Sequence, residues 1–336
     1  MPTATPLAVT LGDPCGIGPD VILKAWQASH DAKLPEFFVI GSTHVLRERA
    51  KLIGLDLDIV EIDTPATPEG NVLCVMDTGI QAVGKPGKPS ETDAQSTIKA
   101  IDLAVDLTVN GNASGVVTAP INKKALYSAG FEHPGHTEYL AELARRMTGE
   151  TAFPVMMLAG PDLRTVPVTI HIPLDAVPGA LTQDLIERTA RIVAFDLSSR
   201  FGIVEPVLAI AGLNPHAGEE GSMGTQDIEV IQPAVNRLLS ENLNVTGPLP
   251  ADTMFHAAAR KQYDVALCMY HDQALIPAKT LAFDDAVNVT LGLPFIRTSP
   301  DHGTAYDIAG TGQANPSSFI AALNMAAEMV RHSHNG

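Results

Sequence analysis

The sequence predicts an α/β protein with a mixed, largely parallel sheet, and three observations lead to this fold class. Short apolar, β-branched runs alternate with amphipathic segments along most of the chain, a rhythm typical of parallel strands joined by helices. In the middle, VMMLAG and RTVPVTI flank a turn at Pro161–Asp162 and predict an antiparallel hairpin. At 336 residues the chain is long enough for two domains.

The first half of the chain shows the strand–helix alternation most clearly. Ser90 and Asp93 have the spacing of a capping box and predict a helix that continues through Leu107. A helix is also expected around VLRERAKL (45–52), and another after the turn APINKKAL (119–126). The predicted strands are PLAVTL (6–11), FFVIG (37–41), DIVEI (58–62), VLCVMD (72–77) and GVVT (115–118).

Four helices are expected from residue 137 onward. Thr137 is the expected cap of a helix whose apolar residues recur at i, i+3, i+4 and i+7. Another helix is expected over 182–199, and one over 226–239 is expected to kink at Pro233. The last spans 317–329. The apolar face of the first helix consists of Leu140, Leu143, Ala144 and Met147.

Charge and cysteine content exclude several classes of protein. A formal net charge of −16 repels nucleic acid and anionic membranes, so neither is an expected partner. Cys15, Cys74 and Cys268 are scattered and form no CxxC pair, which is typical of a reduced cytoplasm and excludes a cysteine-based zinc module. The amino terminus has no secretory pattern and no apolar run is long enough to span a bilayer. A cytoplasmic protein is expected.

Three histidines each follow a short apolar run: His171, His216 and His271. Such runs predict buried strands, and ligands of open α/β sheets bind at the carboxyl ends of strands. Imidazole is the commonest ligand of borderline divalent cations, so the three side chains are candidate metal ligands. The alternative is that each is a hydrogen-bonded structural residue. Asp272 and Gln273 beside the third histidine favour the metal site, because ligand rings need partners that orient them.

Glycine-rich turns supply further candidate sites. GDPCGIGPD (12–20) resembles a dinucleotide fingerprint only superficially, and a tight turn is an equally good interpretation. His136 and Thr137 lie at a predicted helix start, where exposed N–H groups favour anions. Lys279, Asn288 and Arg297 lie beside turns, and together they would suit a phosphate or carboxylate. The loop SPDHGTAYDIAGTGQANP (299–316) is rich in glycine and alanine, so a flat ligand can approach its backbone closely.

Taken in order, the motifs resemble the 4-hydroxythreonine-4-phosphate dehydrogenase family of pyridoxal phosphate biosynthesis. The resemblance covers about residues 6–330, and the loop at 302–316 is also similar to the adenine-side loop of isocitrate and isopropylmalate dehydrogenases. Cys15 stands where the family usually has alanine. The motifs are GDPCGIGPD, VTAPINK, GHTEY, HIPL, GLNPHAGE, PADTMF, MYHDQALIPAK and VNVTLGLPFIRTSPDHGTAYDIAG.

The resemblance implies a fold like that of isocitrate and isopropylmalate dehydrogenases, with two α/β domains and a cleft between them. One domain would comprise 1–130 and 295–336. The other, 131–294, would carry the metal-site histidines and the interface of a homodimer. The active site would lie at that subunit interface, with metal ligands drawn from both subunits.

The resemblance also assigns residues to roles. His171, His216 and His271 would hold a divalent cation, for which zinc suits an all-imidazole set better than magnesium; cobalt is a further candidate. His136 and Asp252 are candidates for the general base, with a metal-bound water as a third. The substrate would contact His136, Thr137, Lys279, Asn288 and Arg297. NAD or NADP would contact Gly303, Thr304, Ala305, Asp307, Ile308 and Asn315.

The implied reaction is NAD(P)-linked oxidation of 4-phosphooxy-L-threonine to 2-amino-3-oxo-4-phosphooxybutanoate. That product would lose carbon dioxide to give 3-amino-2-oxopropyl phosphate, in pyridoxine 5'-phosphate biosynthesis. One alternative keeps the chemistry but oxidises D-threonate or D-erythronate 4-phosphate. Two others are a metallohydrolase, which would act without a nucleotide, and a metabolite-binding or phosphotransferase-like protein. Neither of these last two explains the loop at 302–310.

Overall fold

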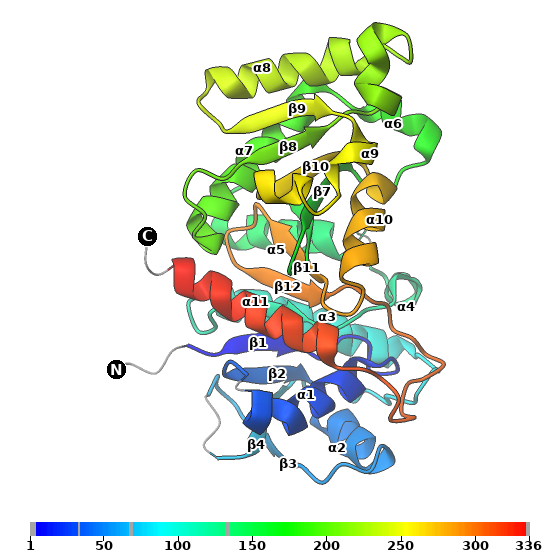
Figure 1. Ribbon diagram of the computed structural model, residues 1–336. Helices are drawn as coiled ribbons and strands as arrows, with labels where there is room; N and C mark the ends of the chain where they lie inside the picture. The colour runs from blue at the N-terminus through cyan, green and yellow to red at the C-terminus, as the bar shows by residue number, and fades with distance from the viewer. Residues whose placement is uncertain (1–4, 33, 67–69, 132, 134, 334–336) are drawn as a thin grey trace. The chain divides into compact units, whose positions relative to one another are not determined.

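The computed structural model describes residues 5–32, 34–66, 70–131, 133 and 135–333. The chain forms two compact units (Figure 1). Unit 1 consists of Met1–Pro154 and Leu293–Val330, and unit 2 consists of Val155–Gly292 and Arg331–Gly336. Unit 1 therefore combines an amino-terminal and a carboxyl-terminal segment, and it continues to Pro154, beyond residue 130 where the sequence analysis placed the first boundary.

Unit 1 contains a parallel sheet in the order β3-β4-β2-β1-β5-β12. The order reverses at β1, which pairs with β2 on one side and β5 on the other. This switch point is where open α/β sheets bind ligands. The strands are β1 (Leu7–Thr10), β2 (Phe37–Gly41), β3 (Asp58–Glu61), β4 (Val72–Asp77), β5 (Val116–Thr118) and β12 (Arg297–Pro300).

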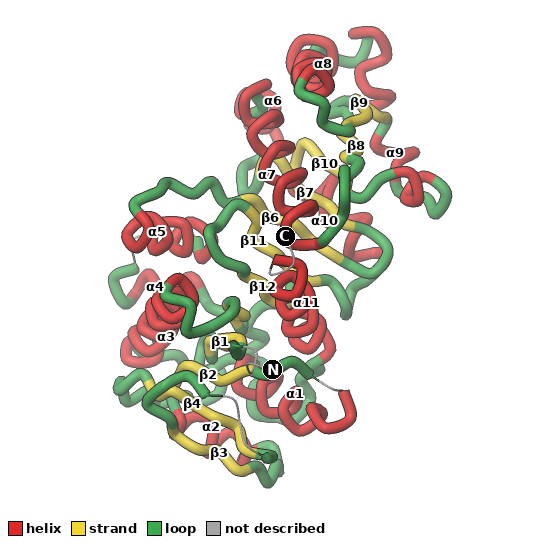
Figure 2. The backbone as a smooth tube through the Cα atoms, turned by 90° about the vertical axis from the view of Figure 1, so that its left-hand side faces the viewer, coloured by secondary structure: helices red, strands yellow, loops and turns green. Residues whose placement is uncertain are grey.

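Helices cover both faces of this sheet. In Figure 2, α3, α4 and α5 lie on one side of the strands, and α1 and α11 on the other. Ala8, Phe38 and Val116 of the strands belong to one buried apolar cluster with Ile101 of α3 and Leu140 of α5. The helices are α1 (Gly18–Ala32), α2 (Thr43–Leu52), α3 (Glu91–Val109), α4 (Lys123–Ser128), α5 (His136–Thr148) and α11 (Ser317–Ser333).

Unit 2 contains a mixed sheet in the order β11-β6-β7-β10-β8-β9. The β11–β6 and β6–β7 pairs are antiparallel, whereas β7, β10, β8 and β9 run parallel. The predicted hairpin and the mixed, largely parallel α/β fold are confirmed. The strands are β6 (Val155–Ala159), β7 (Arg164–Thr169), β8 (Leu208–Ala211), β9 (Val245–Leu249), β10 (Val265–Tyr270) and β11 (Val287–Leu291). The helices are α6 (Val177–Ala180), α7 (Gln183–Phe201), α8 (Gln232–Ser240), α9 (Ala251–Met254) and α10 (His271–Leu281).

The helix boundaries confirm some predictions and correct others. The Ser90–Asp93 capping box is present at the start of α3. Thr137 is not a cap, because α5 begins at His136 after Gly135, which has no side chain to cap the helix. The segment expected over 226–239 is divided into a π-helical turn, Asp227–Ile231, and α8. Pro233 is the second residue of α8 and directly follows the π-helical turn. No described helix is long and apolar enough to cross a membrane.

Arg49 anchors unit 1 through a buried ion pair. Its side chain is 1% exposed and pairs with Asp20, which is fully buried. The guanidinium also donates to the carbonyls of Gly16 at 2.8 Å and Pro14 at 3.0 Å. Without Arg49, the Asp20 carboxylate would be buried without its cation, a change that typically costs about 3–5 kcal/mol.

We therefore expect Arg49→Met to lower the stability of unit 1 by about 3 kcal/mol or more. The readout is urea unfolding followed by the fluorescence of Trp26, the single tryptophan, which is buried in α1 of the same unit. Lys51→Met is the matched control on α2, because the Lys51–Glu48 pair is 73% and 55% exposed. Equal unfolding midpoints for the two variants would contradict the anchoring role of Arg49.

Candidate active site

The three candidate metal ligands follow three neighbouring strands of unit 2. β10 pairs in parallel with both β7 and β8, so the carboxyl ends of these strands lie at one edge of the sheet. His271 directly follows β10, His171 comes two residues after β7, and His216 lies in the segment after β8. The prediction that each histidine follows a buried strand is confirmed.

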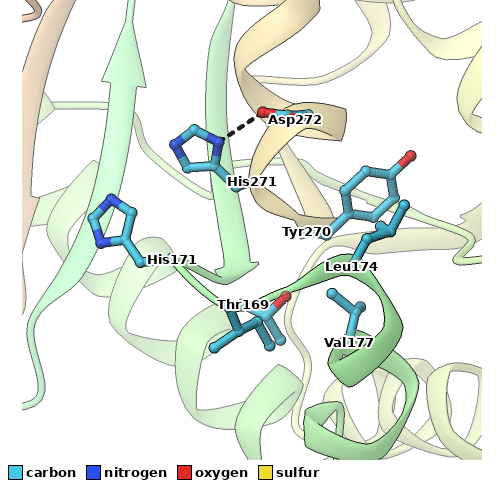
Figure 3. A pocket seen from close by; sticks show the side chains of 8 residues that line it. Thr169, His171, Leu174, Val177, Tyr270, His271 and Asp272 are labelled. Atoms are coloured by element: carbon cyan, nitrogen blue, oxygen red, sulfur yellow. Dashed lines mark hydrogen bonds and ion pairs between the residues drawn. The ribbon is translucent and has the colours of Figure 1, made fainter.

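His171 and His271 lie side by side (Figure 3). Their ring centroids are 5.6 Å apart, because Thr169 and Tyr270 are register partners at the ends of the two strands. His171 has a left-handed backbone with φ 52°, which turns the chain sharply after β7. Both rings line a cavity of about 210 Å³ together with Thr169, Tyr270 and Asp272.

Asp272 orients the His271 ring. Its Oδ1 lies 2.8 Å from His271 Nδ1, so Nε2 is the nitrogen that can ligate a metal, and carboxylate contacts of this kind are typical of metal-bound imidazoles. Asp272 therefore has the partner role that its position suggested. Gln273 does not, because its amide accepts from the Met269 N–H at 2.6 Å and donates to the Gly212 carbonyl at 2.8 Å.

His216 is not grouped with the other two histidines. It lies in the turn Pro215–Gly221, in which five consecutive residues, 216–220, have positive φ values between 40° and 81°. Within the described part of the chain, no set of three or more His, Cys, Asp or Glu side chains is close enough to hold a metal ion. The chain by itself thus brings together two of the three predicted ligands.

Lys279 shares a second hollow with His271. This hollow has a volume of about 450 Å³ and is lined by both side chains, together with Ile276 and Phe283. Ile276 is 65% exposed and Phe283 is 77% exposed. Large apolar side chains that stay exposed beside polar ones are typical of surfaces that bind a ligand or another protein.

Unit 1 holds a second group of predicted site residues around Arg297. This side chain is buried at the start of β12, and its Nη2 donates to Thr118 Oγ1 at 2.7 Å. The same nitrogen lies 3.3 Å from Nδ1 of His136, the first residue of α5. Thr137 follows in the first turn, where unpaired N–H groups favour anions. The group therefore offers donors to an anionic ligand.

Burial and charge set the protonation states in this group. Burial lowers the pKa of the Arg297 guanidinium to about 10, which leaves it protonated at neutral pH. Burial is also the main cause of a His136 pKa well below the ordinary range, and the cations of Arg297 and Lys123 lower it further. At neutral pH, a neutral His136 therefore lies beside a cationic Arg297.

The two remaining predicted substrate residues, and the candidate general base Asp252, lie in unit 2. Lys279 is on α10, Asn288 is on β11, and Asp252 is exposed in the short helix α9. Their convergence with His136, Thr137 and Arg297 on one substrate stays a prediction.

The predicted nucleotide loop packs onto the turn GDPCGIGPD, which explains that motif. Tyr306 donates to Asp13 at 2.5 Å, and the Gly310 N–H donates to Asp20 at 2.9 Å. A Cβ on Gly16 would come within 2.9 Å of Thr304, so only glycine allows this close approach. The turn therefore supports the loop that contains the residues predicted to bind nucleotide, Gly303, Thr304, Ala305, Asp307, Ile308 and Asn315.

Sequence reasoning did not single out Thr118 and Lys123 as site residues. Both lie in the motif VTAPINK, which begins in the last two residues of β5 and continues into the turn after it. The signal was a polar motif after a strand next to the switch point of the sheet.

Comparisons with known proteins agree with the motifs. Residues 33–326 match the family model of the pyridoxal phosphate biosynthetic protein PdxA. A 4-hydroxythreonine-4-phosphate dehydrogenase of Bradyrhizobium diazoefficiens is 52% identical over 97% of each chain. One of Methylorubrum extorquens is 53% identical over 96% of this chain and 93% of its own. The crystal structure of the Klebsiella pneumoniae enzyme of that name superposes with a TM-score of 0.88, at 36% identity, over 97% of this chain and all of the other.

Proposed function

Because the chain belongs to the family of the pyridoxal phosphate biosynthetic protein PdxA, we propose that it is an oxidoreductase acting on 4-phosphooxy-L-threonine. The reaction is NAD(P)-linked oxidation to 2-amino-3-oxo-4-phosphooxybutanoate, which then loses carbon dioxide to give 3-amino-2-oxopropyl phosphate. The observation that carries the proposal is the 52% identity over 97% of the chain to a relative of that activity. The His171–His271 pair and the Arg297 group supply side chains suited to this chemistry.

The chain's imidazoles suit a divalent cation, with zinc favoured. The imidazole rings of His171 and His271 have centroids 5.6 Å apart, and imidazole nitrogens suit a borderline cation. When bound, the cation supplies Lewis-acid chemistry that lowers the pKa of an alcohol. Asp272 contacts Nδ1 of His271 and so orients the ring with its other nitrogen, Nε2, as the one that would bind this cation.

The third ligand is His216 of the partner subunit in a homodimer. Two arguments support this assignment. The described chain does not place His216 beside the other two histidines, and the exposed side chains of Ile276 and Phe283 lie next to His271. The active site would then lie at the subunit interface.

The substrate phosphate is assigned to Arg297, His136 and Thr137, with Lys279 and Asn288 completing the contacts. Arg297 is buried and cationic, and a guanidinium suits the oxygens of a phosphate. A phosphate held here contributes binding energy far from the reacting carbon, and that energy orients the alcohol. The nucleotide, NAD or NADP, is assigned to the loop residues 303–315. Asp252 is a candidate for the general base.

The test is a pair of assays with purified protein, in which NAD(P)H formation is followed at 340 nm. One assay uses 4-phosphooxy-L-threonine and the other uses D-threonate 4-phosphate, which has a hydroxyl instead of the amine at C2. We expect the larger kcat/KM for the amino acid. A larger value for the threonate would contradict the substrate assignment. Activity on a phosphoester without any nucleotide would contradict the dehydrogenase assignment itself.

A further inference from the structure

Three elements of unit 1 meet at the Arg297 side chain. Thr118 ends β5, Arg297 begins β12 and His136 begins α5. A guanidinium Nη atom carries two N–H groups. Nη2 of Arg297 donates to Thr118 Oγ1 at 2.7 Å and lies 3.3 Å from His136 Nδ1, so both of its N–H groups are used within the protein.

The contact with Arg297 determines which nitrogen of His136 carries the proton. A guanidinium is only a donor, so Nδ1 must be the acceptor. A neutral imidazole with an accepting Nδ1 carries its proton on Nε2. In the described part of the chain, the His136 Nε2 atom is buried and has no hydrogen-bond partner. A buried donor left without a partner typically costs about 1–3 kcal/mol, which points to an acceptor supplied by a ligand.

We propose that Arg297 fixes His136 as a neutral Nε2–H donor to an anionic oxygen of the substrate, and that Thr118 positions Arg297 for this purpose. His136 is then a substrate-binding residue and not the general base. The role toward substrate rests on the proposed function, whereas the protonation pattern of the ring does not.

The surrounding charges oppose a basic role for His136. To act as a base at Nε2, the neutral ring would first have to carry its proton on Nδ1, where the N–H group would face the guanidinium of Arg297 and the hydrogen bond between them would be lost. Uptake of a proton at Nε2 would then turn the ring into a cation beside that guanidinium. Lys123 adds a second cation, and burial penalises the charged ring. A neutral His136 that donates from Nε2 avoids both the repulsion from the two cations and the cost of burying a charged ring.

The protonation pattern is testable without turnover. In full-length protein with ¹⁵N-labelled histidine, long-range ¹H–¹⁵N correlations distinguish the two neutral tautomers and the imidazolium, and His136→Gln identifies the signals of His136. We expect the Nε2–H tautomer throughout pH 6–8. Observation of the Nδ1–H tautomer or of the imidazolium in that range would overturn the proposal even if the enzyme oxidises its substrate as proposed.

Two substitutions of His136 separate a donor from a base. The amide nitrogen of Gln takes roughly the place of Nε2, whereas that of Asn takes roughly the place of Nδ1, and neither amide can act as a base. We expect His136→Gln to lose less than about tenfold in kcat, and His136→Asn to raise the substrate KM further than Gln does. A loss in kcat of about 10²-fold or more in both variants, the effect of removing a general base, would overturn the proposal.

The positioning role of Thr118 has its own pair of variants. Thr118→Val removes the hydroxyl that accepts from Arg297 and keeps the shape, whereas Thr118→Ser keeps the hydroxyl. We expect a several-fold higher substrate KM for Thr118→Val with kcat little changed, and a near wild-type KM for Thr118→Ser. Equal KM values in the two variants would contradict the role of the hydroxyl.

Discussion

His271→Ala is expected to lower kcat/KM by about 10³-fold or more, because a catalytic metal contributes several kcal/mol of transition-state stabilisation. The substitution removes one of the two paired imidazoles and leaves Asp272 without the ring that it orients. Metal content by elemental analysis should fall together with NAD(P)H formation. His256→Ala is the control, since His256 is exposed and lines a different cavity of unit 2. A His271→Ala variant that keeps both its metal and its turnover would contradict the metal assignment.

Mixed dimers test how the ligands are shared between subunits. If His171 and His271 act with His216 of the partner subunit, a heterodimer of His271→Ala and His216→Ala chains has one intact site. Random mixing of these inactive chains should therefore restore about a quarter of the wild-type activity, because half of the dimers are mixed and each has one of two sites intact. Mixing His171→Ala with His271→Ala should restore none. Failure of the first mixture to gain activity, with mixed dimers confirmed by mass spectrometry, would contradict shared ligands.

The second large effect is expected for Arg297→Ala, with kcat/KM for 4-phosphooxy-L-threonine reduced by roughly 10²–10³-fold. Truncating one partner of a buried, charged hydrogen-bond pair costs about 2–5 kcal/mol, and every 1.4 kcal/mol is a factor of ten. Arg297→Lys should restore little, because a single ammonium cannot hold Thr118 and His136 and also bind the substrate as the guanidinium does.

Comparison with unphosphorylated 4-hydroxy-L-threonine separates phosphate binding from a general loss of structure. The wild-type protein should prefer the phosphorylated compound strongly, and Arg297→Ala should lose most of that preference. Arg145→Ala serves as the control, because Arg145 is an exposed cation on α5, the same helix that holds His136. An unchanged preference in Arg297→Ala would show that the phosphate is bound elsewhere.

The features that could be predicted from the sequence are those set by residues close to one another along the chain. The Ser90–Asp93 capping box needs only a spacing of three residues, and each histidine stands at most five residues after its own apolar strand. Asp272 is the next residue after His271, so its contact with the ring could be predicted from the sequence. Local pattern is sufficient in such cases because the hydrogen bonds involved span few residues.

Other contacts depend on residues far apart in the chain. Thr118 and Arg297 are 179 residues apart and become partners only because β5 and β12 pair. The turn GDPCGIGPD binds the loop at 302–316 through Asp13 and Tyr306, which are 293 residues apart. The separation of His216 from the other histidines likewise reflects the turn after β8. No periodicity or spacing encodes such pairings.

The most direct test of the account is NAD(P)⁺ reduction by chelator-treated protein with 4-phosphooxy-L-threonine, measured before and after zinc is added back. We predict that chelation removes the 340 nm signal and that zinc restores it in the wild-type protein but not in His271→Ala. Undiminished turnover in protein shown to be free of metal would contradict the metal-assisted mechanism. The absence of nucleotide reduction in zinc-loaded wild-type protein would contradict the dehydrogenase assignment.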